Sequence, residues 1–163
     1  MAYVDLFSDR TSLLTIDAMH ARTVRCRPAA ATTVVRVPSQ GAGPRQGLLF
    51  DLTKQDSAAI ATGEGTAHEG KPYFRYSKID LGDGATPGAL RVEAVTSTKD
   101  CDWVIDVEYS DSQGTHKTVV KDGKKPFFAA GVPADPASRW ILNEQVRAFV
   151  DCDAHRDAWG CKA

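Results

Sequence analysis

Residues 101–109 read Cys-Asp-Trp-Val-Ile-Asp-Val-Glu-Tyr, and every second side chain in this stretch is apolar or aromatic. The odd-numbered residues, from Cys101 to Tyr109, share one side, whereas the even-numbered residues carry three carboxylates and Val104. This two-residue period is typical of a half-buried strand. The stretch therefore predicts a central strand of an all-β core.

A polar segment, residues 110–115, follows this predicted strand and contains Gly114. Glycine accepts a positive φ without steric cost, so the segment is suited to a tight turn. The next apolar run, residues 116–120, can then return antiparallel to residues 101–109.

Further runs have the pattern of short strands separated by turns rich in Gly and Pro. In residues 48–53, for example, Leu48, Phe50 and Leu52 share one face. The other strand-like runs are residues 32–37, 72–81, 90–95 and 126–130. Residues 54–71 are instead expected to hold one helical turn before an exposed loop.

Two segments leave alternatives open. Residues 13–26 could form a helix through residues 18–22 or a long, irregular edge strand, and the alternation around Cys26 favours a strand for the second half. Residues 137–150 read as a hairpin or as a short helix that begins near Pro136, and we favour the hairpin.

About seven to nine short strands at spacings of about ten residues predict an all-β fold, an immunoglobulin-like antiparallel β-sandwich with a C-terminal disulfide-closed extension. We expect residues 1–12 to be a loosely ordered lead-in and residues 13–163 to form a single domain. A chain of 163 residues can bury a core without help from metals or covalent links.

The charge balance argues against a nucleic-acid partner. The chain has 20 basic and 21 acidic side chains and a formal net charge of −1, so it offers no strong field of one sign. No apolar run approaches the ~20 residues that span a bilayer, and the first residues lack the pattern of a signal peptide. We therefore expect no membrane span in this chain, although the full-length protein could be attached to one.

The four cysteines, Cys26, Cys101, Cys152 and Cys161, are even in number and widely spaced. Of the three possible connectivities we favour Cys26–Cys101 with Cys152–Cys161, because the first two lie in or beside strand-like runs and the last two bracket a short loop. Disulfides persist outside a reducing cytosol, so this pairing predicts an extracellular or extracytoplasmic location. Four free thiols in a cytosolic protein are the alternative.

The C-terminal segment contains the densest group of potential metal ligands. Cys152, His155 and Cys161 could supply three ligands of a zinc ion, with Asp157 or a distant histidine as the fourth. Their spacing matches no zinc ribbon or finger, so we favour a disulfide-closed loop and predict no metal or other cofactor. The distant histidines are His20, His68 and His116.

No catalytic residue is assigned. The sequence contains no Gly-x-Ser-x-Gly elbow that would pair a nucleophile with a histidine. Asp102, Asp106 and Glu108 line the outer face of the predicted central strand, where two carboxylates could act on a glycoside. Charged side chains on a solvated strand face are, however, expected in any sandwich.

The aromatic cluster at residues 73–76 is the best candidate binding surface. In a strand, Tyr73 and Arg75 face one way and Phe74 and Tyr76 the other, so one pair could present an amphipathic platform to a sugar or peptide. Tyr73, Arg75 and Tyr76 are therefore candidate binding residues, and packing is the alternative role.

Four segments resemble the exported β-sandwich domains of high-GC actinobacterial membrane or secreted proteins. They are Val24-Arg-Cys-Arg-Pro28, Leu48-Leu-Phe-Asp-Leu52, Lys71-Pro-Tyr-Phe74 and Asp100-Cys-Asp-Trp103. The resemblance covers most of residues 20–130, implies a sensing or binding role outside the membrane, and transfers no catalytic residue.

We therefore expect a non-catalytic extracytoplasmic module that recognises a protein, peptide or cell-wall glycan through its loops or an exposed strand edge. Two alternatives come from other functional classes. One is a small secreted hydrolase or metal-dependent enzyme centred on the C-terminal His, Asp and Cys side chains. The other is a secreted protease inhibitor that presents a disulfide-braced loop.

Overall fold

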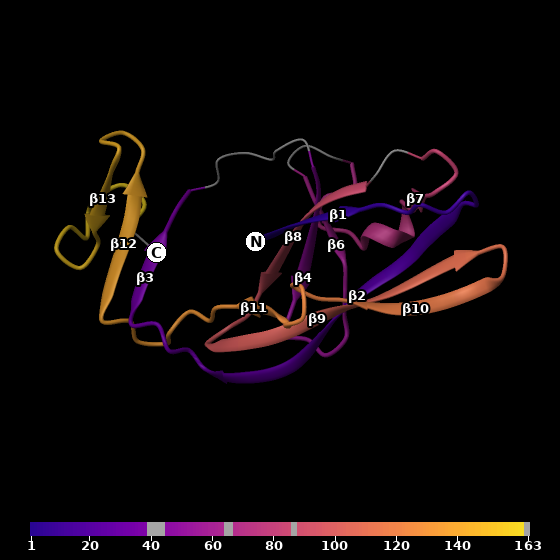
Figure 1. Cartoon of the computed structure of the whole chain (residues 1–163). Coiled ribbons are helices and arrows are strands. Elements are labelled where there is room, and N and C mark those ends of the chain that lie inside the picture. The colour runs from indigo at the N-terminus through magenta and orange to yellow at the C-terminus, as the bar shows by residue number, and fades with distance from the viewer. Residues whose placement is uncertain (39–44, 64–66, 86–87, 162–163) are drawn as a thin grey trace.

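A computed structural model of the chain describes residues 1–38, 45–63, 67–85 and 88–161. In these ranges the chain forms thirteen strands, arranged in three sheets, and one short 3-10 helix (Figure 1). The predicted all-β class is confirmed.

The strand bounds are as follows. The first sheet has the order β1 (Ala2–Leu6), β8 (Gly88–Val95), β4 (Gln46–Asp51), β6 (Ile60–Thr62). The second has the order β10 (Gly114–Val120), β9 (Lys99–Asp111), β2 (Leu14–Pro28), β5 (Ser57–Ala58), with β11 (Phe127–Ala129) also on β9 and β7 (Ile79–Leu81) also on β2. The third has the order β13 (Ala148–Asp151), β12 (Ser138–Asn143), β3 (Thr33–Arg36).

Strand β9 is the central strand that the alternation in residues 101–109 predicts. It pairs with β2 along one edge and with β10 and β11 along the other. Its inward side chains, Cys101, Trp103, Ile105 and Val107, are at most 3 % exposed. The hairpin to β10 has Gly114 at a φ of 129°, which glycine tolerates better than other residues.

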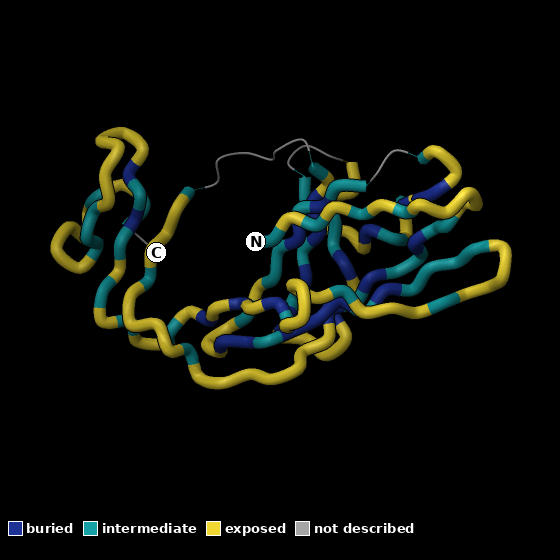
Figure 2. The backbone as a smooth tube through the Cα atoms, in the orientation of Figure 1, coloured by how far each residue is buried: buried dark blue, intermediate teal, exposed yellow. Residues whose placement is uncertain are grey.

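The first and second sheets enclose one hydrophobic core. Phe50 of β4 lies 5.6 Å from Trp103 of β9 between ring centroids, and Trp103 lies 5.1 Å from Phe127 of β11. Buried residues gather between these two sheets (Figure 2). This two-layer arrangement supports the description of the main body as a β-sandwich.

The third sheet lies to one side of this main body (Figure 1). Ile141 of β12 is 2 % exposed but lies outside the main core cluster. The C-terminal loop covers it: Gly160 approaches so closely that a Cβ there would be 2.1 Å from Ile141 Cδ1. The third sheet thus has a small core of its own.

Two adjacent strand pairs are parallel, β4 with β8 and β3 with β12, whereas a wholly antiparallel sandwich was expected. A two-residue alternation reports which side chains share a face but not the direction of the neighbouring strand. The immunoglobulin-like arrangement is not confirmed. The Cys26–Cys101 disulfide joins adjacent strands of one sheet, whereas the characteristic bridge of antibody domains joins two facing sheets.

Three local expectations are wrong. Residues 2–6 of the expected loose lead-in form β1, which pairs with β8 and packs Val4 and Leu6 against the core. The helical turn expected in residues 54–71 is replaced by β5 and β6, because pairing with β2 and β4 prevails over local helix propensity. Residues 72–81 are not one strand but a 3-10 helix, Tyr73–Arg75, followed by β7.

The segments with open alternatives are strands. Strand β2 is irregular as expected, with register shifts between Ile16 and Ala18 and between Thr23 and Arg25. In the described structure residues 22–28 pair with β9 alone, so this half of β2 is an edge. The hairpin favoured for the C-terminal segment is confirmed by the pairing of β12 with β13.

The central core predicts a large difference between two matched truncations. Phe50→Ala should lower the free energy of unfolding by ~3–5 kcal/mol, because it removes a fully buried ring from between the two sheets. Phe128→Ala should lower it by less than ~1 kcal/mol, because that ring is 56 % exposed and lies under the guanidinium of Arg27. Urea denaturation measures both values, and similar losses would contradict the assigned core.

Candidate functional site

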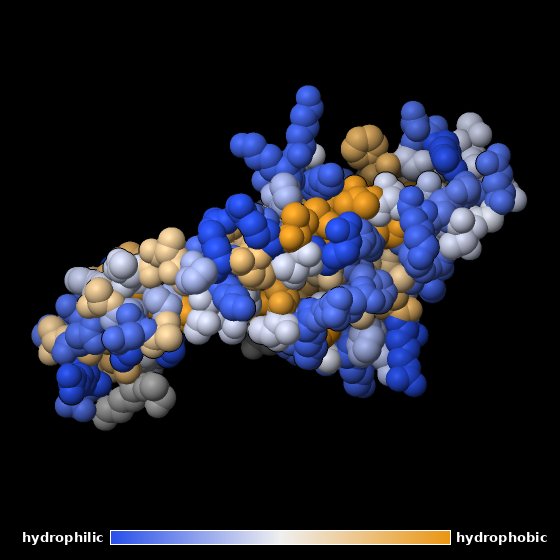
Figure 3. Space-filling view, turned by 90° about the horizontal axis from the view of Figure 1, so that it is seen from below, coloured by the Kyte–Doolittle hydropathy of each residue, from blue (hydrophilic) through white to orange (hydrophobic). Residues whose placement is uncertain are grey.

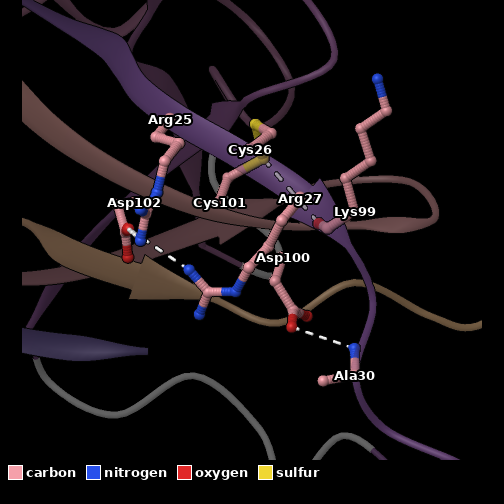
Figure 4. Close-up of polar contacts among 8 residues, drawn as sticks. All are labelled: Arg25, Cys26, Arg27, Ala30, Lys99, Asp100, Cys101 and Asp102. Atoms are coloured by element: carbon pink, nitrogen blue, oxygen red, sulfur yellow. Dashed lines mark hydrogen bonds and ion pairs between the residues drawn. A yellow bond between two sulfur atoms is a disulfide. The ribbon is translucent and has the colours of Figure 1, made fainter.

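Both predicted disulfides are present, and one of them lies where the main body meets the third sheet. Cys26 of β2 and Cys101 of β9 are direct cross-strand partners with Cα atoms 4.2 Å apart (Figure 4). Cys101 is buried and Cys26 is exposed. The covalent bond therefore fixes the last residues of β2 against the start of β9.

Asp100, next to Cys101, forms what we term the clamp. One of its carboxylate oxygens accepts the N–H of Ala30 at 3.1 Å, and the other accepts the N–H of Gly131 at 2.9 Å. The residue is only 4 % exposed. The N–H groups of Gly131 and Ala30 lower the pKa of this carboxyl, because they stabilise its charged form.

The clamp holds the two connections that lead to the third sheet. We term these connections the stems: residues 29–32, which precede β3, and residues 130–137, which precede β12. Backbone bonds from Ala29 to Thr98 and from Val132 to Ser97, at 3.1 and 2.9 Å, add to the clamp. Because both stems leave from the same end of the main body, β3 and β12 run parallel.

Gly131 is required at the clamp for close packing. A Cβ at this position would lie 2.5 Å from the backbone nitrogen and carbonyl carbon of Lys99. Real Cβ atoms do not approach backbone so closely, and the backbone of Lys99 has no free end to move away. The second stem can therefore reach Asp100 only through a glycine.

A group of charged side chains covers the exposed side of the clamp. The guanidinium groups of Arg25 and Arg27 lie 3.3 and 3.5 Å from the same carboxylate oxygen of Asp102 (Figure 4). Arg27 also lies over the ring of Phe128, at 5.6 Å from its centroid. Pairs this exposed contribute little stability, so the group acts as a solvated cover of the strand end.

The third sheet exposes apolar side chains and strand edges. In the described structure β3 and β13 each have one neighbour, β12, so each leaves one edge open. In the space-filling view the third sheet forms one end of an elongated molecule, with pale apolar side chains among charged ones (Figure 3). The large apolar side chains exposed on or beside this sheet are Val35, Val37, Val132, Val146, Phe149 and Trp159.

A second apolar area lies on the main body in the same view, over the second sheet (Figure 3). The exposed apolar side chains on strands of that sheet include Val24, Val119 and Phe128. Charged pairs such as Arg22 with Asp106 lie among them. This surface belongs to a sheet that already has a complete core on its other face.

The C-terminal loop is closed by the Cys152–Cys161 disulfide. Its backbone makes successive turns, with N–H to C=O bonds from His155 to Asp151 at 2.9 Å and from Ala158 to His155 at 3.0 Å. Since both sulfurs are in the disulfide, the zinc alternative built on Cys152, His155 and Cys161 loses two of its three ligands. The described part of the chain contains no cluster of three metal-ligating side chains.

The three candidate binding residues are separated by the structure. Tyr73 is 7 % exposed and donates its hydroxyl to the side chain of Gln46, and burial raises its pKa. Arg75 and Tyr76 reach the surface, where the Tyr76 ring stacks on His68 at 4.2 Å between centroids. Lys71 and Arg75 each lie 5.8 Å from that ring.

The carboxylates on the outer face of β9 are held by cations. Asp106 and Glu108 border a groove of about 410 Å³ that is also lined by His20. Arg22 donates two bonds to Asp106, at 2.7 and 3.0 Å. The Lys117 ammonium donates to Glu108 and lowers its pKa. A general acid for glycoside hydrolysis needs a raised pKa, so these pairs do not favour that chemistry.

Two of the described histidines lie close to carboxylates. Nδ1 of His20 lies 3.2 Å from Asp56, and Nε2 of His116 lies 3.0 Å from Asp111. The side chain of Asp111 is 2 % exposed and also contacts Arg10. The N–H of Gln113, together with His116 and Arg10, lowers the pKa of Asp111 to about 2.

Comparisons with protein-family models, with curated proteins and with solved structures gave no match. Among the residues that the structure describes, no helix is long and apolar enough to cross a membrane.

The clamp predicts a local effect of Asp100→Ala. Loss of the carboxylate leaves the N–H groups of Ala30 and Gly131 without their acceptor, so amide hydrogen exchange at both should become roughly tenfold faster. Asp102→Ala is the matched control, because its carboxylate contacts only exposed arginines. Equal effects of the two variants would contradict the clamp.

The lowered pKa of Asp111 predicts acid sensitivity. Its pKa is about 2 in the folded chain and ~3.9 when unfolded, so its stabilising contribution is present above about pH 4 and is lost as the pH falls toward 2. Asp111→Asn should therefore flatten the decline in unfolding free energy over this pH range, measured by urea denaturation. Asp9→Asn serves as a control, and an unchanged slope for Asp111→Asn would refute the assignment.

Proposed function

We propose that this protein is a non-catalytic binding module that acts in an extracytoplasmic, oxidising environment and contacts a protein or peptide partner through its third sheet. The observation that carries the proposal is the set of exposed apolar side chains on a sheet held away from the core. Exposed apolar clusters of this kind commonly mark interaction sites.

The third sheet is too small to bury its own apolar side chains. It has three strands, and among its described residues Ile141 is the one large apolar side chain that is buried. A sheet this small gains stability when further apolar surface on it is removed from water. A partner that covers Val35 and Phe149 would supply that contact.

The open strand edges favour an extended peptide segment as the contacting element. An edge strand presents unpaired N–H and C=O groups, and a peptide that adds to such an edge gains main-chain hydrogen bonds. Val35 on strand β3 and Val37, just after the strand, are both exposed. These side chains provide apolar contacts beside the backbone pairing.

The cysteines support the extracytoplasmic location. All four are paired, and a reducing cytosol does not maintain such bonds. The resemblance to exported actinobacterial β-sandwich domains leads to the same proposal, and the immunoglobulin-like arrangement expected from the strand spacing stays a proposal. The resemblance assigns no role to individual residues.

Other partners and activities have less support. A glycan platform at Tyr76 is disfavoured because His68 stacks on that ring and cations surround it. A protease reads its substrate as an extended chain, whereas the loop between Cys152 and Cys161 is a series of turns. An enzyme centred on this loop would need ligands that the disulfide consumes.

Peptide display tests the proposal. Peptides selected on the immobilised protein should protect amides of β3 or β13 from hydrogen exchange. Val35→Thr should weaken their binding at least tenfold, because it places a hydroxyl in the apolar contact. Val24→Thr is the matched control: the two valines are 53 % and 52 % exposed and both lie on strands.

Three results would overturn the proposal. They are the failure of repeated selections to yield a binder, protection confined to the main body, and equal effects of the two valine variants. Concentration-dependent dimerisation through β3, detected by light scattering, would instead identify the partner as a second copy of the chain.

A further inference from the structure

A pocket of about 380 Å³ lies beneath the C-terminal loop. Its lining consists of Arg139 from β12 and of Cys152, Asp153, Arg156 and Cys161 from the loop. The pocket therefore belongs to the third sheet and is closed on one side by a covalent bond.

Backbone contacts hold the walls of this pocket in place. The N–H of Arg139 donates to the carboxylate of Asp153 at 3.0 Å, and the N–H of Cys152 donates to the carbonyl of Arg139 at 2.8 Å. The loop is thus tied to β12 at Arg139 and closed at Cys161. A site with this backbone support is arranged before a ligand arrives.

The two arginines of the pocket differ from most others in the chain. No ion pair joins the guanidinium of Arg139 or Arg156 to any residue that the structure describes. Six arginines elsewhere in the chain do have a described carboxylate partner: Arg10, Arg22, Arg25, Arg27, Arg45 and Arg91. A guanidinium carries five N–H donors in a fixed fork that matches carboxylate, phosphate and sulfate oxygens.

The lining has an excess of positive charge. It contains two arginines and one carboxylate, Asp153, and that carboxylate already accepts the N–H of Arg139. The whole chain has a net charge of −1 and so does not attract anions in general. Attraction for an anion must therefore be local to this pocket.

We propose that this pocket binds an oxyanion, with Arg139 and Arg156 as its donors. The inference rests on the proposed function to the extent that the oxyanion belongs to the partner of the third sheet. A carboxylate of an acidic peptide and a phosphate or sulfate ester share the required chemistry. Direct binding of the free anions does not depend on any partner.

Amide NMR titrations with acetate, inorganic phosphate and inorganic sulfate at constant ionic strength test the proposal. At least one anion should cause saturable shifts confined to residue 139 and residues 152–161. Saturation by acetate alone identifies a carboxylate as the ligand, and saturation by phosphate or sulfate identifies an ester.

Variants assign the donors. Arg139→Gln and Arg156→Gln should each weaken the anion at least about tenfold, the size expected for loss of a charge-assisted hydrogen bond. Arg36→Gln on β3 is the matched control and should leave the affinity unchanged. The folded state of each variant is verified from its unperturbed spectrum outside the loop.

Shifts that do not saturate, that spread over all basic residues, or that persist in both pocket variants would overturn the oxyanion site. If peptides selected on the third sheet still bind those variants with wild-type affinity, the proposed function stands and only the oxyanion site is wrong. If the anions bind but no peptide does, the reverse holds.

Discussion

Asp100 is the residue on which the position of the third sheet depends. Its two carboxylate oxygens accept one N–H from each stem, so a single buried side chain fixes both connections at the same point. A buried carboxylate is costly unless its oxygens are satisfied, and here backbone donors satisfy both. The parallel pairing of β3 with β12 follows from this common origin.

The clamp stands on a strand that is paired along both edges and held by a disulfide. Asp100 lies in β9, which is flanked on both sides, and its neighbour Cys101 is bonded to Cys26. On the inner side of β9, Trp103 packs between the rings of Phe50 and Phe127. A displacement of Asp100 would therefore disturb the main core. The direction of the two stems thus depends on the packing of the whole main body.

Local patterns in the sequence predicted the central strand, the hairpins and the disulfide pairing, because alternation, turn residues and cysteine spacing are encoded by near neighbours. They did not predict the parallel pairing of β3 with β12, whose partners lie about one hundred residues apart. They also did not predict the 3-10 helix that buries Tyr73, because strand alternation and a single helical turn look alike over four residues.

The candidate sites were less predictable still. The His68 ring stacks on Tyr76 only because the fold brings them together. Arg139 and Arg156 line one pocket only because the C-terminal loop returns to β12. Nothing in the sequence distinguishes the buried Asp100 from the exposed Asp102, since an acidic residue acquires such a role from the backbone donors around it.

The two disulfides constrain very different lengths of chain, and the difference bears on where a partner would act. With sequence separations of 75 and 9 residues, loop entropy assigns roughly 4 to 5 kcal/mol to Cys26–Cys101 and about 2 to 3 kcal/mol to Cys152–Cys161. The stronger constraint stabilises the body, which already has the larger core, and the weaker one serves the sheet around Ile141. Ligands stabilise most visibly the elements that are least stable alone, so the third sheet is where binding would order the chain most.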